Sequence, residues 1–270
     1  RCRTTLYHLL LSDSDLLGHS MIKPKKYIYT IFSVIFIIGI IGYLLQPKRD
    51  LPQIKRQGIL KVVVPTDSFY GFEYDLLQSY LRTIDVEARF EVEKGISSSI
   101  EKLKTGECDL LLRLIPTTQT LKDEVLFTQP IAKTRLLLLQ NQHNNTRNYN
   151  DLENDTIVIE KNSPYLTRLY NLQEEIGLEN LNITEVDATP EEIINLLINN
   201  NIKFTIYDEF SFHLLPPNKL INAQTVISTH HFLAWAVAPT CNLLKNDIET
   251  WLTQYTNSLS YRDLIRKYYH

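Results

Sequence analysis

Apolar residues along this chain follow two alternating patterns, and their order predicts an α/β fold. Short apolar runs at Ile59–Pro65 (ILKVVVP) and Cys108–Ile115 (CDLLLRLI) are typical of strands buried on both faces. Between them, Phe72–Ile84 has apolar residues at helical spacing, and Ser97–Glu107 reads as a second helix that stops at Gly106. Strands and helices in this alternation predict parallel βαβ units.

The second half of the chain repeats this alternation. Ser163 and Thr189 each precede a proline, so we expect them to cap helices over residues 163–177 and 189–201. A last helical stretch is expected from Leu243 to Tyr269. Further strands are predicted at RLLLLQ (135–140), TIVIE (156–160), KFTIYDE (203–209) and FLAWAVAP (232–239).

One stretch, Tyr27–Leu45, is apolar enough to predict a membrane anchor. It reads YIYTIFSVIFIIGIIGYLL, without a charged residue, and as a helix it would be about 28 Å long, close to the hydrocarbon thickness of a bilayer. The basic stub 21–26 precedes it, so the positive-inside rule places the N-terminus in the cytoplasm. We expect an uncleaved single-pass anchor in a bacterial inner membrane, with the folded part in the periplasm. The alternative is a buried core helix.

The segments that flank this stretch carry weaker signals. Met21 begins MIKPKK, which is typical of a natural start, so residues 1–20 are expected to be an upstream or disordered extension. Residues 46–57 are polar and contain two prolines, which predicts a linker between the anchor and the folded part.

Composition and charge exclude several function classes. The net charge is −3 and no basic patch is concentrated enough to predict a nucleic-acid partner. Cys108 and Cys241 could form a disulfide, although two buried free thiols are the favoured interpretation. Neither a zinc-ligand spacing nor a nucleophile, phosphate-loop or HExxH motif is present. The sequence therefore predicts no metal, no cofactor and no catalytic residue.

Three motifs in order resemble one family of binding proteins. GFEYDL (71–76), KLKTGECDLL (102–111) and FTQP (127–130) are similar to solute-binding protein family 3, the type II periplasmic binding proteins. Within that family the chain looks most like the solute-binding part of the membrane-bound lytic murein transglycosylases. The resemblance covers about residues 58–269.

The resemblance implies two α/β lobes that hold a ligand between them. Lobe 1 would be residues 58–135 with 226–270, lobe 2 would be residues 136–225, and two strands would cross between them. The implied function is a membrane-anchored solute-binding domain for an amino-acid-like, peptide or muropeptide ligand. One alternative is the regulatory part of a transglycosylase whose catalytic domain lies elsewhere. Another is the substrate-binding component of an ABC transporter.

The resemblance also implies ligand-binding residues. Phe69 and Tyr70 would place an aromatic ring over the ligand, Thr118 would hold a carboxylate, and Asp208 would accept an ammonium group. Loop packing for the first two residues and helix capping for Asp208 are the alternatives. The sequence departs from the family pattern at Leu121, where amino-acid binders carry an arginine that forks onto the carboxylate. We therefore expect free α-amino acids to bind weakly.

Two further residues are candidates for the cleft. Arg113, at the end of a predicted strand, could point into it, or could lie on the rim of a lobe. Ser163 could bind an anion at a helix N-terminus, or could only cap that helix. Lys122, next to Leu121, could supply a positive charge in place of the missing arginine.

Overall fold

The computed structural model describes residues 32–37, 49–66, 71–177 and 181–270. The chain divides into two units, Arg1–Pro47 and Lys48–His270, which we treat separately. In the first unit, residues 32–37 form a short helical segment with exposed side chains. No helix among the described residues is long and apolar enough to cross a membrane. The rest of the predicted anchor lies outside the described residues, so the anchor stays a prediction.

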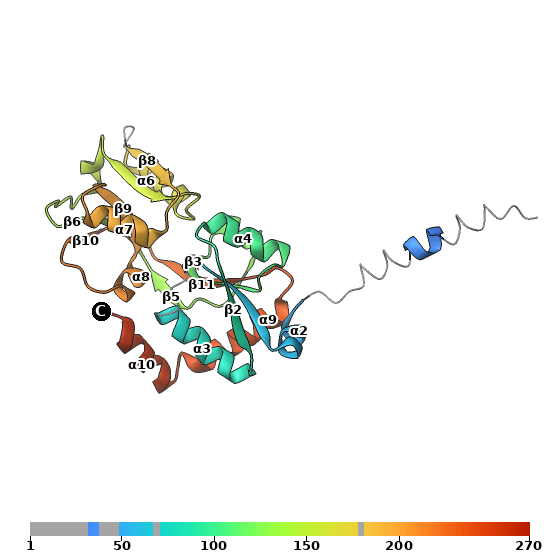
Figure 1. The fold of residues 1–270 in the computed structure, drawn as a ribbon. Coiled ribbons are helices and arrows are strands. Elements are labelled where there is room, and N and C mark those ends of the chain that lie inside the picture. Colours follow the sequence, from blue (N-terminus) through green and yellow to red (C-terminus); the bar gives the residue numbers. More distant parts are fainter. Residues whose placement is uncertain (1–31, 38–48, 67–70, 178–180) are drawn as a thin grey trace, which may run out of the picture. The chain divides into compact units, whose positions relative to one another are not determined.

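The second unit contains two sheets, each at the centre of one lobe (Figure 1). In the first sheet β1 is parallel to its neighbours β2 and β3, while β11 is antiparallel to β3, β4 and β5. The strand order is β2 (Glu87–Val92), β1 (Ile59–Val64), β3 (Leu110–Pro116), β11 (His231–Val237) and β4 (Leu126–Phe127), and β5 (Ala132–Thr134) also pairs with β11. The helices in this part of the chain are α2 (Leu51–Gln57), α3 (Phe72–Ile84), α4 (Ile96–Thr105), α5 (Gln119–Lys122), α9 (Asn242–Tyr255) and α10 (Leu259–Tyr268).

The second sheet is built in the same way from the middle of the chain. Strand β7 is parallel to β8 and β9, and β6 is antiparallel to β9 and β10. The order is β10 (Ile221–Val226), β6 (Leu136–Asn141), β9 (Phe204–Asp208), β7 (Thr156–Glu160) and β8 (Asn182–Val186). The helical elements here are η1 (Tyr149–Leu152), α6 (Leu166–Ile176), α7 (Pro190–Ile198) and α8 (Glu209–Leu214). The predicted two-lobed α/β architecture is confirmed.

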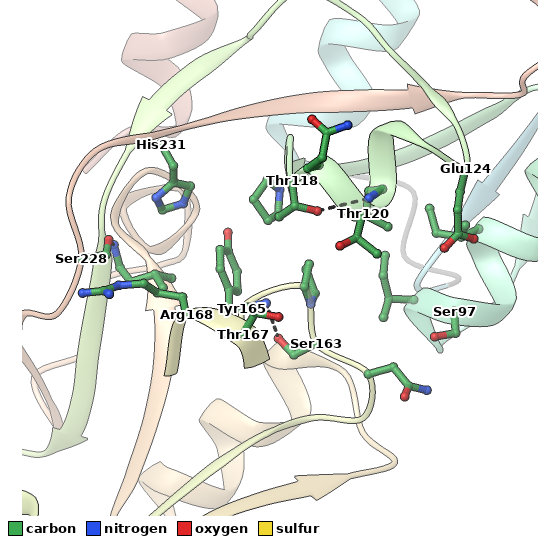
Figure 2. Close-up of a pocket in the computed structure, with 18 of the residues that line it drawn as sticks. Ser97, Thr118, Thr120, Glu124, Ser163, Tyr165, Thr167, Arg168, Ser228 and His231 are labelled. Atoms are coloured by element: carbon green, nitrogen blue, oxygen red, sulfur yellow. Dashed lines mark hydrogen bonds between the residues drawn. The ribbon is translucent and has the colours of Figure 1, made fainter. Parts of the chain in front are cut away.

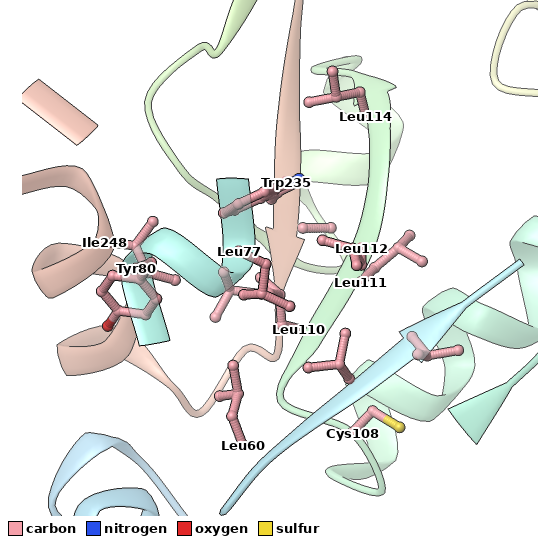
Figure 3. Close-up of a cluster of buried hydrophobic side chains, with 14 of the residues drawn as sticks. Leu60, Leu77, Tyr80, Cys108, Leu110, Leu111, Leu112, Leu114, Trp235 and Ile248 are labelled. Atoms are coloured by element: carbon pink, nitrogen blue, oxygen red, sulfur yellow. The ribbon is translucent and has the colours of Figure 1, made fainter. Parts of the chain in front are cut away.

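Burial explains why the strands of the second sheet have continuous apolar runs. Leu136 and Leu138 pack with α6 residues on one face of the sheet, whereas Leu137 and Leu139 pack with α7 residues on the other. In the first lobe, Figure 3 shows Tyr80 of α3, Leu110 of β3 and Trp235 of β11 in one buried cluster, and each of these side chains is fully buried. A strand that is covered on both faces has apolar residues on both, so apolar and polar residues do not alternate along it.

Two chain crossings connect the lobes, one from β5 to β6 and one from β10 to β11. They run side by side, because Leu136 N–H donates to Ser228 Oγ at 2.8 Å and Ile227 N–H donates to the Leu136 carbonyl at 2.9 Å. Nearby, Arg135 forms an ion pair with Glu209 at 2.5 Å. Paired crossing strands of this kind can act as a hinge between two lobes.

The prediction of a linker at residues 46–57 was wrong for its second half. Residues Leu51–Gln57 form helix α2, which begins with a capping box at Asp50 and buries Ile54. The Asp50 carboxylate also accepts from the backbone N–H groups of Leu243 and Leu244 at the start of α9, both at 2.9 Å. The polar composition that suggested a linker is therefore the composition of a capped surface helix.

The predicted start of the helix at Ser163 was also wrong. Helix α6 begins at Leu166, with Tyr165 in the N-cap position. Ser163 Oγ instead accepts from the Tyr165 N–H at 3.3 Å, which closes a turn ahead of the helix. The prediction for Thr189 is confirmed, since it caps α7 in a capping box with Glu192.

The two cysteines of the folded unit are both buried and free. Burial raises the pKa of each thiol to about 12, so neither is a reactive thiolate at neutral pH.

Candidate ligand-binding cleft

Two cavities lie between the lobes and together form the cleft. The larger compartment has a volume of about 940 Å³ and the smaller compartment about 700 Å³. Both volumes are within the range of small-molecule sites. The compartments meet at four residues that line both of them: Pro116, Ser163, Pro164 and Tyr165.

A buried ion pair spans the larger compartment from one lobe to the other. Arg113 extends from β3 of the first lobe, and its Nη1 donates to Glu160 Oε1 at 2.8 Å, while Nη2 donates to Oε2. Glu160 is the last residue of β7 in the second lobe, and its side chain is only 5% exposed. Both oxygens of Glu160 and both terminal nitrogens of Arg113 are therefore used in one bidentate pair.

Asp208 lies at the end of β9 and faces the same compartment. Its Oδ1 accepts from the Ser211 N–H at 2.8 Å, so the carboxylate caps α8 while it lines the cavity. Burial raises the pKa of Asp208 to about 6, and the capping hydrogen bond and Arg113 act against this rise. Helix capping and cleft lining are thus both properties of this residue.

Glu73, the second residue of α3, is a buried acid that reaches the edge of the first sheet. The pairing of β11 with β3 shifts register between Ala234 and Ala236 of β11. Leu114 lies in the irregular stretch of β3 opposite this shift, and its N–H donates to Glu73 Oε1 at 3.0 Å. Its Oε2 is buried and has no hydrogen-bond partner among the described residues. Burial raises the pKa of Glu73 to about 7, and Asp208 adds to the rise.

Two adjacent acids at the start of α7 complete the larger compartment. Glu191 accepts a hydrogen bond from the Tyr207 hydroxyl at 2.7 Å. Glu192 pairs instead with Lys94 of the first lobe at 2.7 Å, and this second inter-lobe pair is exposed to solvent. Carboxylates therefore outnumber cations in the larger compartment.

The smaller compartment is mainly apolar and is lined by helices α4, α5 and α6 (Figure 2). The Thr118 hydroxyl accepts from the Leu121 N–H at 3.3 Å, so Thr118 caps α5. Tyr165 rises between the compartments with its ring against His231, at a centroid distance of 5.6 Å. Burial lowers the pKa of His231, so its imidazole is neutral at neutral pH. Further apolar lining comes from Ile96, Ile100, Leu121, Leu136 and Pro164.

The structure brings most of the sequence-predicted residues to the cleft. Arg113 and Asp208 line the larger compartment, Thr118 lines the smaller one, and Ser163 lines both. Phe69 and Tyr70 lie outside the described residues. The Lys122 side chain is exposed and lines neither compartment, so it does not stand in for an arginine at position 121.

Sequence reasoning missed several polar residues of the larger compartment, among them Glu73, Glu160, Glu191 and Tyr207. A signal existed for Glu160, because a charged residue that ends a buried parallel strand lies at the edge where ligands bind. Glu73 lies in the GFEYDL motif. Nothing in the sequence pairs Glu160 with Arg113, which is 47 residues away.

The described part of the cleft offers charged, hydrogen-bonding and apolar groups to a ligand. No group of three His, Cys, Asp or Glu residues is placed to hold a metal ion within the described ranges. The cleft can hold a solute by hydrogen bonds, charge and apolar contact.

Comparison with solved structures supports the same architecture. The ancestral amino acid-binding protein AncCDT-1, a precursor of cyclohexadienyl dehydratase, superposes with a TM-score of 0.67 at 18% identity, over 82% of this chain and 99% of that one. The amino acid ABC transporter substrate-binding protein AbpA from Streptococcus pneumoniae, bound to L-arginine, has a TM-score of 0.68 at 15% identity, over 80% and 96% of the two chains. At these identities the likeness concerns the fold.

Sequence comparison gives a related answer. The membrane-bound lytic murein transglycosylase F of Pseudoalteromonas translucida is 25% identical over 191 residues, which are 63% of this chain and 38% of the relative. This chain spans less than half the length of the curated relatives that it matches. The sequence profile of the bacterial extracellular solute-binding proteins, family 3, matches residues 61–270. With this match over most of its length, the chain belongs to the bacterial extracellular solute-binding proteins, family 3.

Proposed function

We propose that this chain is a membrane-anchored, extracytoplasmic solute-binding protein without catalytic activity. Its two lobes close on a small ligand that occupies the cleft between them. The observation that carries the proposal is the pair of compartments lined by residues of both lobes, next to two antiparallel chain crossings. A ligand held by both lobes favours the closed arrangement because only that arrangement makes both sets of contacts.

The anchor and the periplasmic location rest on the sequence. The uncharged stretch Tyr27–Leu45 and the lysines before it support a single span with residues after 45 outside the cytoplasm. A fusion of alkaline phosphatase after His270 would test the orientation. Enzymatic activity of the fusion is expected, and an inactive fusion that is recovered from the cytosol would contradict the location.

A thermal-shift screen of the chain tests the binding function. Amino acids, amines, short peptides and muropeptides are the arms of the screen. A ligand present at about 100 times its Kd stabilises the folded state by about 2.7 kcal/mol, which is a clear rise in Tm for a domain of this size. We expect at least one arm to produce such a rise, together with a smaller radius of gyration in solution scattering.

A matched pair of variants places the ligand in the cleft. Asp208→Asn keeps the helix cap, since asparagine caps as well as aspartate, but removes a charge from the larger compartment. Asp263→Asn makes the same change on the exposed face of α10, where the side chain contacts Arg266. Only the first variant is expected to weaken binding. Equal effects of both variants, or no ligand in any arm, would contradict the proposal.

A second candidate is the regulatory part of a lytic murein transglycosylase, which the similarity to the Pseudoalteromonas relative favours. Under this candidate the ligand is derived from peptidoglycan. An in-frame lysozyme-like domain downstream of residue 270 in the gene would support it, and neighbouring permease and ATPase genes would favour a transport role instead.

A further inference from the structure

Two basic side chains line one end of the smaller compartment, and each has a nitrogen atom without a partner. Arg168 comes from the first turn of α6, and His231 is the first residue of β11. Arg168 Nε and His231 Nε2 are both buried, and neither forms a hydrogen bond within the described ranges. Buried polar nitrogens without a partner are uncommon in folded proteins, so two of them on residues that line one cavity point to a ligand that accepts hydrogen bonds.

Both groups can donate to an anion. The guanidinium group of Arg168 carries a fixed positive charge, and either ring nitrogen of a neutral imidazole can hold the proton and donate it. The terminal nitrogens of Arg168 contact Glu175 at 2.8 Å and the Ile227 carbonyl at 3.3 Å. The side chain of Glu175 is exposed, so this ion pair is screened by water and leaves the charge of Arg168 available to a ligand.

The acids of the smaller compartment do not occupy this end. Figure 2 shows Arg168 and His231 at one end of the compartment and Glu124 at the other. Glu101 and Glu124, the two acids that line the compartment, are both paired with Lys104. The end that Arg168 and His231 line is therefore the more positive one, and it suits a carboxylate.

The larger compartment has the opposite chemistry, because it is lined by two acids that form no ion pair among the described residues. Asp208 is buried with one oxygen on the Ser211 N–H, and Glu73 has a buried Oε2 without a partner in the described part of the chain. Burial raises the pKa of both acids more than Arg113 lowers it, so each pKa stays above its ordinary value. Arg113, which is paired with Glu160, therefore does not offset the burial of these acids, and an ammonium group would.

Tyr165 lies between the two charged ends of the cleft. It lines both compartments, and its ring packs against His231 at a centroid distance of 5.6 Å. Burial and the charge of Asp208 raise the pKa of Tyr165, so its hydroxyl lies within the field of the larger compartment. Arg168 and His231 line only the smaller compartment, whereas the two acids, Glu73 and Asp208, line only the larger one. An ammonium group and a carboxylate on the same carbon atom are therefore too close together to reach both ends.

On the basis of the proposed solute-binding function, we infer that the cleft binds a zwitterion whose ammonium and carboxylate groups are several bonds apart, as in a dipeptide. The ammonium group lies between Glu73 and Asp208. The ligand passes Tyr165, and its carboxylate contacts Arg168 and His231, which take the place of an arginine at position 121. A second residue adds about 3.3–3.6 Å to an extended chain, so a dipeptide carries its two charges further apart than a free α-amino acid does.

Isomeric and amidated ligands test the separation of the two charges. Isothermal titration calorimetry of the chain compares δ-aminovalerate with its isomer norvaline, which has both charged groups on one carbon atom. It also compares dialanine with dialaninamide, which lacks the carboxylate. We expect δ-aminovalerate and dialanine each to bind at least about tenfold more tightly than its counterpart, because hydrogen bonds to charged groups are lost in the counterpart.

Failure of either comparison would overturn the inference, whether the counterpart binds as tightly or neither ligand of the pair binds. The solute-binding function is tested separately. It would fail only if every arm of the thermal-shift screen also gave no ligand.

The role of Arg168 can be tested with the ligand that lacks the carboxylate. Arg168→Met should weaken the binding of dialanine at least about tenfold and change the affinity for dialaninamide less than about twofold, because only dialanine offers an anion. Arg266→Met removes a cation from the exposed face of α10, where it pairs with Asp263, and should change neither affinity. Equal weakening of both ligands by Arg168→Met would mean that this side chain only supports the chain crossing at Ile227, and would overturn its role in binding.

The second donor can be removed without removing the ring. His231→Phe keeps an aromatic contact with Tyr165 but lacks Nε2, and should weaken the binding of dialanine about threefold to tenfold. The same calorimetry measures this loss. Wild-type affinity for dialanine in His231→Phe, with the fold verified by circular dichroism, would contradict the placement of the carboxylate.

Discussion

Two ion pairs cross the same cleft and join the same two lobes, but they lie in different surroundings. Arg113 and Glu160 have side chains that are 15% and 5% exposed, and they meet in a bidentate geometry. Lys94 and Glu192 are 63% and 45% exposed, and they meet through one contact at 2.7 Å. Both pairs place the cation on the first lobe and the carboxylate on the second. They differ in burial and in contact geometry.

This difference in burial decides how much each ion pair contributes to the stability of the folded protein. An exposed pair is screened by water and salt, and measured values for such pairs are about 0–1 kcal/mol. A buried pair has already lost its hydration, so the loss of one partner leaves a charge that nothing compensates. The buried pair therefore also removes Arg113 from the set of groups that a ligand could use, whereas the exposed pair lies at the rim.

The largest effect is expected from breaking the buried pair on one side. Glu160→Gln leaves the guanidinium group of Arg113 in the cleft without its carboxylate, and should lower the free energy of unfolding by about 3–5 kcal/mol. Water that enters between the lobes would relieve part of this cost, so we also expect a larger radius of gyration. Urea unfolding and solution scattering measure the two effects.

A double variant distinguishes the loss of the Arg113–Glu160 ion pair from the effect of leaving one buried charge without its partner. Arg113→Met with Glu160→Met removes both charges, and should recover most of the stability that Glu160→Gln loses, because no buried charge remains. A double variant as unstable as the single variant would show that the pair itself stabilises the closed lobes.

A smaller effect, with a defined pH dependence, is expected at Glu73. The pKa of Glu73 in the folded state is raised from 4.5 to about 7. Between these two pH values the folded protein therefore holds a proton that the unfolded chain has lost. Its contribution to stability therefore falls as pH rises from about 4.5 to 7. Glu73→Gln removes this contribution, and should gain of order 1–3 kcal/mol relative to the wild type between pH 4 and pH 8. Thermal unfolding at both pH values measures the gain, and the same difference in Tm at both would contradict the assignment.

The smallest effect is expected at the exposed pair. Lys94→Met should change the free energy of unfolding by at most about 1 kcal/mol, and salt should reduce this change further. Thermal unfolding at about 0.05 M and at about 1 M salt measures both quantities, because the screening length falls more than about threefold between these two concentrations. A loss comparable to that of Glu160→Gln would mean that burial does not distinguish the two pairs.

Much of the fold could be read from the sequence because its signals are local. The run Leu136–Gln140 is apolar at four successive positions, and β6 is buried on both faces as that pattern predicts. Thr189 before Pro190 predicts a helix start, and α7 begins there. At Ser163 the same signal failed, because its hydroxyl closes a turn with Tyr165 and the helix begins at Leu166.

Other features depended on contacts between distant parts of the chain. Residues 51–57 look like a linker from their polarity, but Asp50 caps α2 and also the start of α9, which is nearly two hundred residues later in the sequence. Arg49 likewise pairs with the buried carboxylate of Asp109 at 2.6 Å. Such contacts order a segment that is unremarkable in composition.

The sequence alone determined the alternation of strands and helices, the likeness to a family of binding proteins, and the absence of an arginine at position 121, because each of these is a property of neighbouring residues. Only the tertiary structure decided how the charges of the cleft are paired. Arg113 and Glu160 come from different lobes and pair with each other, while Glu73, Glu191 and Asp208 are brought to the same compartment from three separate elements and form no ion pair among the described residues. Electrostatic interaction depends on distance and burial, and both are set by the packing of elements that are far apart in the sequence.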